Sequence, residues 1–241
     1  MKAFLLAGGL GTRLRPLTDS TAKCLLPVQG TPMLQIWFDI CRQYGIDEVL
    51  INVHSHGDAV RKFIHEQKDG LRIRLFEETE LLGSAGTVRA NQEWVSKEPS
   101  FWVFYADVLT TTNLNRMLSF HDSRTQIATI GVYEVPDPSR CGVVQLDERG
   151  VVIDFVEKPK TPAGNLAFSG LLLATPALLN YIPEIVPVDL GFHVLPRIVG
   201  RMAAYQISDF IIDIGTLETY RAAQNTWPGR SQSQTQGVAR V

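Results

Sequence analysis

In the N-terminal half of the chain, short apolar runs alternate with amphipathic stretches. Continuous apolar runs at residues 2–7, 49–53 and 101–105 indicate buried strands, and alternating apolar and basic positions at 71–75 indicate a half-exposed strand. Between them, apolar residues at steps of three and four predict a helix over 33–44, and residues 59–67 and 86–94 also look helical. Because helices separate the strands, the pattern predicts a Rossmann-like, doubly wound α/β sheet.

The C-terminal half changes character and adds strands of mixed direction. The turn at 147–150 predicts a hairpin between strands at 143–146 and 151–156. Further strands are expected at 127–135, 168–174, 204–207 and 210–212, and helices at 194–202 and 217–224. No linker or internal repeat interrupts this order. We therefore expect one domain over residues 1–227 with a mixed sheet, followed by a polar, disordered tail over 228–241.

Composition narrows the function classes. The 241 residues are 45% hydrophobic and 20% charged, with a formal net charge of -2. The sequence contains no basic run, so a nucleic-acid partner is not expected. The first apolar stretch, 3–7, is too short for a membrane span or a signal peptide, so we expect a cytoplasmic protein without membrane partners. The three cysteines lack metal-ligand spacing.

A glycine loop at residues 8–18 carries the most informative chemistry. Glycines directly after a first strand let backbone N–H groups approach phosphates, and Arg13, Arg15 and Lys23 supply cations. Leu14 stands where a dinucleotide fingerprint needs its third glycine, and no Gly-Lys-Ser/Thr of a P-loop follows. Spacing alone leaves two interpretations open, namely a phosphate-binding loop or a glycine turn with solvated basic residues.

The loop, together with Lys23 and the segments 27–28 and 31–33, resembles the N-terminal signature of the sugar-1-phosphate nucleotidyltransferases, and most closely that of the mannose-1-phosphate guanylyltransferases. Further segments resemble the same family in the same order: 83–86, 105–107, 141–143, 157–159, 189–196 and 213–216. The resemblance reaches about Trp227. It implies a single nucleotidyltransferase domain that transfers a nucleotidyl group from a triphosphate to a sugar 1-phosphate, with GTP and mannose 1-phosphate as our best expectation.

The resemblance also implies roles for individual residues. Arg13, Lys23 and Asp107 would be catalytic, and Asp107 and Asp213 would hold Mg²⁺, which prefers carboxylate and phosphate oxygens. The nucleotide would contact Leu6, Ala7, Gly8, Gly9, Gly11, Thr12, Arg13, Gly83, Ser84 and Gly86. The sugar phosphate would contact Gly142, Glu157, Lys158, Phe168 and Gly170. The acidic run 77–80 is expected to be a solvated loop, and the assembly state, including a homo-oligomer, stays open.

Several positions depart from the family pattern. Phe168 stands where relatives commonly have asparagine, His193 where they often have an acid, Ala106 replaces glycine and Cys141 replaces tyrosine. The departures concern the sugar side more than the phosphate side. Two alternatives to an active transferase are a non-catalytic regulator that binds a nucleotide sugar, and an enzyme that acts on an alcohol phosphate. The retained charge set Arg13, Lys23, Asp107 and Asp213 favours the transferase over the regulator.

Overall fold

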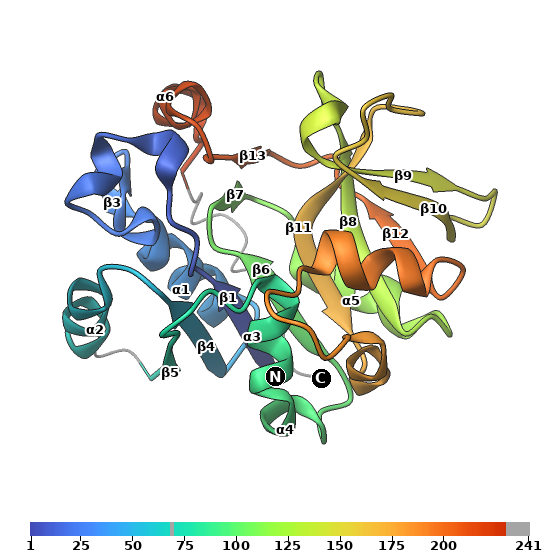
Figure 1. The fold of residues 1–241 in the computed structure, drawn as a ribbon, viewed down its shortest axis with the longest axis horizontal. Helices are drawn as coiled ribbons and strands as arrows, with labels where there is room; N and C mark the ends of the chain where they lie inside the picture. The colour runs from blue at the N-terminus through green and yellow to red at the C-terminus, as the bar shows by residue number, and fades with distance from the viewer. Residues whose placement is uncertain (68–69, 230–241) are drawn as a thin grey trace, which may run out of the picture.

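A nine-stranded mixed sheet runs through the part of the chain that the computed structural model describes, residues 1–67 and 70–229 (Figure 1). Its strands follow the order β10-β9-β11-β6-β1-β4-β5, and β12 pairs with β8, which pairs with β11. The strands are β1 (Lys2–Leu6), β4 (Glu48–Val53), β5 (Arg72–Glu77), β6 (Phe101–Tyr105), β8 (Ala128–Glu134), β9 (Gly142–Leu146), β10 (Val152–Glu157), β11 (Leu166–Ala174) and β12 (Met202–Gln206).

Strand direction divides the sheet into two parts. β5, β4, β1 and β6 are parallel neighbours, as the alternation of strands and helices predicts. β11 then runs antiparallel to β6, to β8 and to β9, and β9 and β10 form the predicted antiparallel hairpin. The prediction of a mixed, doubly wound α/β sheet is confirmed. Two small ribbons lie outside this sheet: β2 (Pro27–Val28) with β3 (Thr31–Pro32), and β7 (Val108–Thr110) with β13 (Ile211–Asp213).

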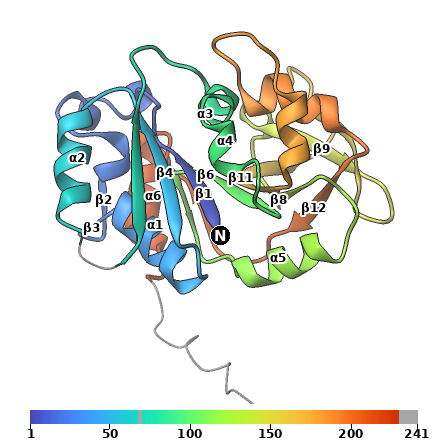
Figure 2. The same ribbon diagram turned by 90° about the horizontal axis from the view of Figure 1, so that it is seen from below.

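Each face of the sheet has its own core because successive side chains of a strand point to opposite faces. Ala3 and Leu5 of β1 belong to the core under α1, α2, α5 and α6, whereas Phe4 belongs to the core under α3 and α4. Figure 2 shows α3 and α4 on the side opposite α1 and α2. The helices are α1 (Met33–Gln43), α2 (Gly57–His65), α3 (Ser84–Ala90), α4 (Gln92–Val95), α5 (Leu114–Asp122) and α6 (Leu217–Thr226).

None of the described helices is long and apolar enough to cross a membrane.

Several predicted elements need correction. The helix expected over 194–202 is wrong: a π-helical turn at Leu190–Val194 leads into a 3₁₀ turn at Leu195–Ile198, and β12 begins at Met202. Pro196 lies inside this segment and lacks the N–H that a regular helix needs, and Gly200 adopts a φ of 80°. The helix expected over 86–94 is two short helices, α3 and α4. The predicted tail lies outside the described residues from position 230 onward.

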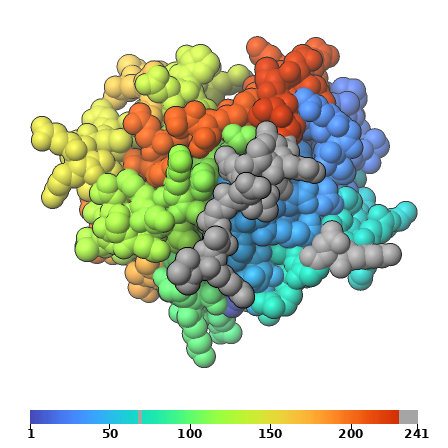
Figure 3. Space-filling view, turned by 180° about the vertical axis from the view of Figure 1, so that it is seen from behind, coloured from blue at the N-terminus to red at the C-terminus, as the bar shows by residue number. Residues whose placement is uncertain are grey.

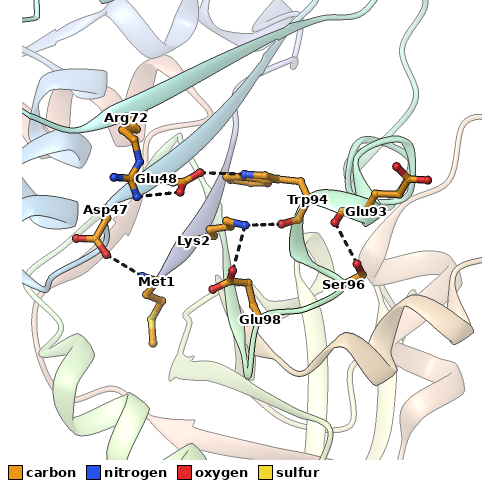
Figure 4. Close-up of polar contacts among 9 residues, drawn as sticks. All are labelled: Met1, Lys2, Asp47, Glu48, Arg72, Glu93, Trp94, Ser96 and Glu98. Atoms are coloured by element: carbon orange, nitrogen blue, oxygen red, sulfur yellow. Dashed lines mark hydrogen bonds and ion pairs between the residues drawn. The ribbon is translucent and has the colours of Figure 1, made fainter.

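A polar network joins the amino ends of β1 and β4 to α4 and to the segment that follows it (Figure 4). Lys2 donates to the Trp94 carbonyl at 2.7 Å and pairs with Glu98 at 3.0 Å. Glu48 accepts from the Trp94 indole at 3.2 Å and from Arg72 at 2.8 Å. This network therefore stabilises the end of the sheet opposite the site described below.

Helix α6 is hydrogen-bonded to the segment that follows the glycine loop. Tyr220 and Gln224 of α6 both donate to the Pro27 carbonyl, at 2.6 and 2.7 Å. The Gln29 amide donates to Gln224 at 2.8 Å. The space-filling view shows α6, in red, against the blue N-terminal segment (Figure 3). Residues far apart in sequence thus support the loop that carries Lys23.

Candidate functional site

The carboxyl ends of β1 and β6 open onto a cavity of about 530 Å³, which also reaches Asn52 near the end of β4. Ligands of open α/β sheets bind at this edge, because the loops after the strands meet there. The cavity is lined by Leu6, Ala7, Gly8, Gly9, Lys23, Cys24, Asn52, Glu78, Leu81, Gly83, Ser84, Tyr105, Ala106, Asp107, Pro187, Asp189, Phe192 and His193.

A buried polar network supports the glycine loop from below. Asn52 accepts from the Ala7 amide at 2.7 Å and donates to Glu78 at 2.8 Å. Thr87 of α3 hydrogen-bonds to both Asn52 and Glu78. A side chain at Gly8 would clash, since its Cβ would lie 2.6 Å from the Asn52 amide nitrogen. The expectation of a solvated acidic loop is therefore wrong for Glu78, which is only 6% exposed.

Opposite charges gather beside the loop. Asp107 follows β6, and Asp213 ends β13, where it pairs in register with Val108. The Ile214 amide donates to the Asp107 carbonyl at 2.9 Å, which fixes the two aspartates next to each other. Lys23 forms an ion pair with Asp107. A Cβ on Gly215 would lie 2.9 Å from the Arg13 guanidinium and 2.5 Å from the Asp213 carboxylate, so Arg13 and Asp213 meet around this glycine.

The electrostatics of this cluster suit a divalent cation. The surrounding protein and then the charge of Asp107 raise the pKa of the Asp213 carboxyl, while Lys23, the Gly215 amide and Arg13 oppose the rise. Two carboxylates that repel each other at an accessible position favour a cation between them. Among the described residues, no group of three or more His, Cys, Asp or Glu side chains could form a fuller metal site. A cation here would take its other oxygens from phosphate and water, as Mg²⁺ commonly does.

Ser84 connects the start of α3 with the segment that closes the cavity. Its hydroxyl donates to Asp189 at 2.8 Å and accepts from the Leu190 amide at 2.7 Å. The Tyr105 hydroxyl donates to Ser84 at 3.4 Å, and burial raises the pKa of this phenol. Gly83 packs against the Val188 backbone, and the Gly86 amide donates to the Val188 carbonyl at 3.0 Å.

Glu157 and Lys158 lie at the open end of the β9–β10 hairpin. Glu157 pairs in register with Gly142, and a Cβ on Gly142 or on Gly191 would lie within 2.7 Å of its carboxylate. Burial is the main cause that raises the pKa of Glu157, and Asp189 adds to it. The Lys158 ammonium lies 5.4 Å from the centre of the Phe192 ring. Because Gly142 and Gly191 have no side chains, the Glu157 carboxylate fits next to them.

Phe168 and Gly170 lie in the irregular part of β11. Phe168 packs edge-to-face on Tyr105 and Phe155, with ring centres 5.8 and 6.4 Å apart. Gly170 adopts a φ of 80°, and a Cβ there would lie 3.0 Å from Tyr105. Both residues therefore pack around Tyr105, which itself lines the cavity.

The structure brings together only part of the predicted set. Leu6, Ala7, Gly8, Gly9, Lys23, Gly83, Ser84 and Asp107 line the cavity. Arg13 and Asp213 are not part of the lining, but they meet beside Gly215, and Asp213 lies close enough to Asp107 for that charge to raise its pKa. Gly11 and Thr12 form the turn that leads to Arg13, and Arg15 pairs with Asp19 at 3.2 Å. Gly86, Gly142, Glu157, Lys158, Phe168 and Gly170 lie outside the lining. The sequence gives no local signal for Asn52 or Glu78 as site residues. The family resemblance covers segment 189–196, but it does not single out Asp189 or Phe192, which also line the cavity.

Comparison with known sequences gives one family and a set of relatives. The model of the nucleotidyl transferase family matches residues 2–228. Mannose-1-phosphate guanylyltransferase 1 of Arabidopsis thaliana is 36% identical over 228 residues, which cover 91% of this chain and 63% of that protein. The mannose-1-phosphate guanylyltransferase catalytic subunit beta of Xenopus tropicalis is 34% identical over 221 residues, or 89% of this chain and 61% of that protein. The chain therefore spans less than two thirds of the length of these relatives.

Solved structures with the same fold extend the comparison. A Bacillus anthracis protein assigned as a glucose-1-phosphate thymidylyltransferase superposes with a TM-score of 0.84 at 25% identity, covering 96% of each chain. HddC of Yersinia pseudotuberculosis superposes with a TM-score of 0.78 at 22% identity, covering 94% of this chain and 99% of that one. The second likeness concerns the fold alone.

Proposed function

The chain belongs to the nucleotidyl transferase family, and on that premise we propose that it transfers a nucleotidyl group from a nucleoside triphosphate to a sugar 1-phosphate, with release of pyrophosphate. One observation carries the proposal. The glycine loop, the cations Lys23 and Arg13 and the carboxylates Asp107 and Asp213 meet at one edge of the sheet. Such a set suits a reaction between two phosphate-bearing substrates.

The proposed mechanism rests on alignment and on charge neutralisation. The attacking phosphate oxygen is already anionic, so the reaction needs no strong general base. Lys23 would bridge the α-phosphate and the incoming phosphate, and Arg13 would contact the leaving pyrophosphate. The backbone amides of the loop at Gly8 and Gly9 would approach the triphosphate, since neither glycine carries a side chain that could block it.

We assign Asp107 and Asp213 to hold Mg²⁺. When bound, the cation would supply positive charge against the phosphate oxygens of the reacting groups. The two carboxylates support this assignment because the charge of Asp107 raises the pKa of Asp213, and a cation between them would relieve that repulsion. Lys23, which pairs with Asp107, would be released toward the phosphates as they enter.

On the sugar side, Glu157 would accept hydrogen bonds from sugar hydroxyls and Lys158 would pair with the sugar phosphate. Gly142 would offer its backbone next to Glu157. The names of the relatives at 34–36% identity support mannose 1-phosphate and GTP as the substrates. The small residues Gly83 and Ser84 in the cavity wall are consistent with the space that a purine needs.

A pyrophosphate-release assay tests the proposal. The purified protein is incubated with each of four triphosphates (GTP, ATP, UTP and dTTP) against a panel of hexose 1-phosphates and against phosphocholine, with Mg²⁺ and with EDTA. We expect release only when both substrates and Mg²⁺ are present, with GTP and mannose 1-phosphate as the best pair. A clear preference for dTTP would refute the choice of base. Nucleotide-sugar binding without release from any pair would instead favour a regulatory protein, and release with phosphocholine alone would favour an alcohol-phosphate enzyme.

A further inference from the structure

His193 is a polar residue of the cavity wall that the mechanism above leaves without a role. It belongs to the π-helical turn Leu190–Val194 and is half-buried. Its Nδ1 atom accepts a hydrogen bond from the backbone N–H of Asp189 at 2.9 Å. π-Helical turns occur often at functional sites, where they aim side chains that a regular helix would direct elsewhere.

This hydrogen bond fixes the tautomer of the ring. A backbone N–H can only donate, so Nδ1 must be the unprotonated, accepting nitrogen. The proton of the neutral imidazole is therefore on Nε2. Among the described residues, Nε2 has no hydrogen-bonding partner, and it is not enclosed away from solvent. His193 thus presents one N–H donor on a ring that lines the cavity.

Further hydrogen bonds fix the turn that carries His193. The His193 amide donates back to the Asp189 carbonyl at 3.0 Å. The Asp189 carboxylate accepts from the Ser84 hydroxyl at 2.8 Å and from the Phe192 amide at 3.2 Å. A donor that is already oriented loses little conformational entropy when it binds a ligand.

The neighbouring charges indicate which ligand atoms suit this donor. Lys23, Arg13 and Lys158 supply the cations that phosphate oxygens require, and ionised partners form the stronger hydrogen bonds. A neutral N–H in the same cavity wall as Lys23 suits an uncharged oxygen. We propose that His193 determines substrate specificity by donating from Nε2 to an uncharged acceptor oxygen, either a hydroxyl of the hexose or the carbonyl of the base. This inference rests on the proposed function.

Two substitutions test the Nδ1 acceptor and the Nε2 donor of the His193 ring separately. In His193→Asn, the amide oxygen occupies the place of Nδ1, so the bond from the Asp189 amide is kept and the Nε2 donor is lost. In His193→Gln, the amide nitrogen reaches the place of Nε2, so the donor is kept and the Nδ1 acceptor is lost. A purely structural role would be rescued by asparagine, and a role in substrate binding would be rescued by glutamine.

The test measures kcat/KM of both variants and of the unmodified protein with GTP and mannose 1-phosphate. We expect His193→Asn to lose about tenfold, the upper range for one neutral hydrogen bond, and His193→Gln to stay within about threefold. The source of the oxygen follows from analogues. Deoxymannose 1-phosphates each remove one hydroxyl, and 2-aminoadenosine triphosphate replaces the purine carbonyl by an amine. The unmodified protein should discriminate against one of these analogues, and His193→Asn should not.

The outcomes separate this inference from the proposed function. If the unmodified protein is active but both variants are equally impaired or equally active, His193 has no such role and the function stands. If no substrate pair reacts, the function fails, and the affinity of GDP-mannose, UDP-glucose and dTDP-glucose by calorimetry replaces turnover as the readout for the same two variants. Equal affinity of the variants for these ligands, or no binding by the unmodified protein, would overturn the inference.

Discussion

At the scale of single residues, the site depends on carboxylates that the fold keeps close despite their repulsion. The protein environment and Asp107 together raise the pKa of Asp213, so ionising both groups works against folding. Lys23 and Arg13 offset part of this cost. Such an arrangement is expected where charges are needed for chemistry and not for stability.

The variant Asp107→Asn tests whether the charge of this residue serves catalysis and not stability. The variant keeps the shape of the side chain but removes a charge from the proposed metal pair. We expect the turnover number to fall at least about a hundredfold, since alignment of the transferring phosphate is lost. The melting temperature in metal-free buffer should change little, because the lost ion pair with Lys23 is offset by reduced repulsion of Asp213.

The matched control is Asp58→Asn. The Asp58 side chain is 99% exposed on α2, pairs with Arg61 and is not part of the cavity lining, so its variant should match the unmodified protein in turnover and melting temperature. Near-normal turnover of Asp107→Asn in limiting Mg²⁺ would contradict the assignment of this residue.

At the scale of elements, the glycine loop and the network beneath it act as one unit. Gly8 packs against Asn52, whereas a Cβ on Gly9 would meet nothing within 4 Å. The two neighbouring glycines therefore differ in what they require: Gly8 needs space on the protein side, and Gly9 faces open space.

Paired alanine substitutions should reveal this difference in stability. Gly8→Ala should lower the free energy of unfolding by roughly 1–3 kcal/mol, because it displaces Asn52 from buried partners. Gly9→Ala should be neutral or slightly stabilising, since alanine restricts the unfolded chain. Urea denaturation of both variants provides the measurement. Equal stabilities would mean that the loop moves away from Asn52 at no cost.

How far the sequence predicts these elements depends on how local their causes are. The strands β1, β4 and β6 and the helix α1 follow from periodicity and are confirmed. α5 is absent from the predicted elements although it has a local signal, with Asn113 as its capping residue and apolar residues at Leu114, Met117 and Leu118. The π-helical turn has no such signal. Its contacts come from separate segments: Gly191 packs on Glu157, the Leu190 amide donates to Ser84, and Ser84 donates to Asp189.

The site residues likewise divide into those that local sequence motifs predict and those that only the tertiary structure brings together. Gly8, Lys23 and Asp107 belong to short motifs that the sequence displays. The network of Asn52, Glu78 and Thr87 joins three separate segments, and an acidic run alone indicates a solvated loop. Only the tertiary structure reveals that Glu78 is enclosed.

At the scale of the whole molecule, the two ends of the parallel strands have different roles. The carboxyl ends open onto the cavity, and the amino ends are joined by polar contacts around Glu48 (Figure 4). Burial opposes ionisation of Glu48, but hydrogen bonds from Trp94 and Arg72 and the charges of Arg72 and Lys2 outweigh it and lower its pKa.

Glu48→Gln should therefore change stability in a pH-dependent way. A lowered pKa in the folded state contributes stability above the ordinary value of 4.5, and this contribution is lost as the pH falls through the folded-state value. We expect the variant to be less stable at pH 7 by about 0.5 kcal/mol, and this difference to shrink as the pH falls below 4.5 and through the folded-state pKa. Glu148→Gln, in an exposed turn, is the control, and melting curves from pH 3 to 8 give the answer. A pH-independent difference would point to lost packing.

The pairing of β7 with β13 has a consequence for the order in which activity can arise. The ribosome synthesises the parallel strands and the glycine loop before β13 and α6. A nascent chain can thus form a nucleotide-facing edge before its second carboxylate exists, and the loop with Lys23 still lacks the clamp from Tyr220 and Gln224. A chain that stops before Ile211 would carry most of the sheet but no aspartate pair. The proposed catalysis therefore requires that β13 has been synthesised and paired with β7.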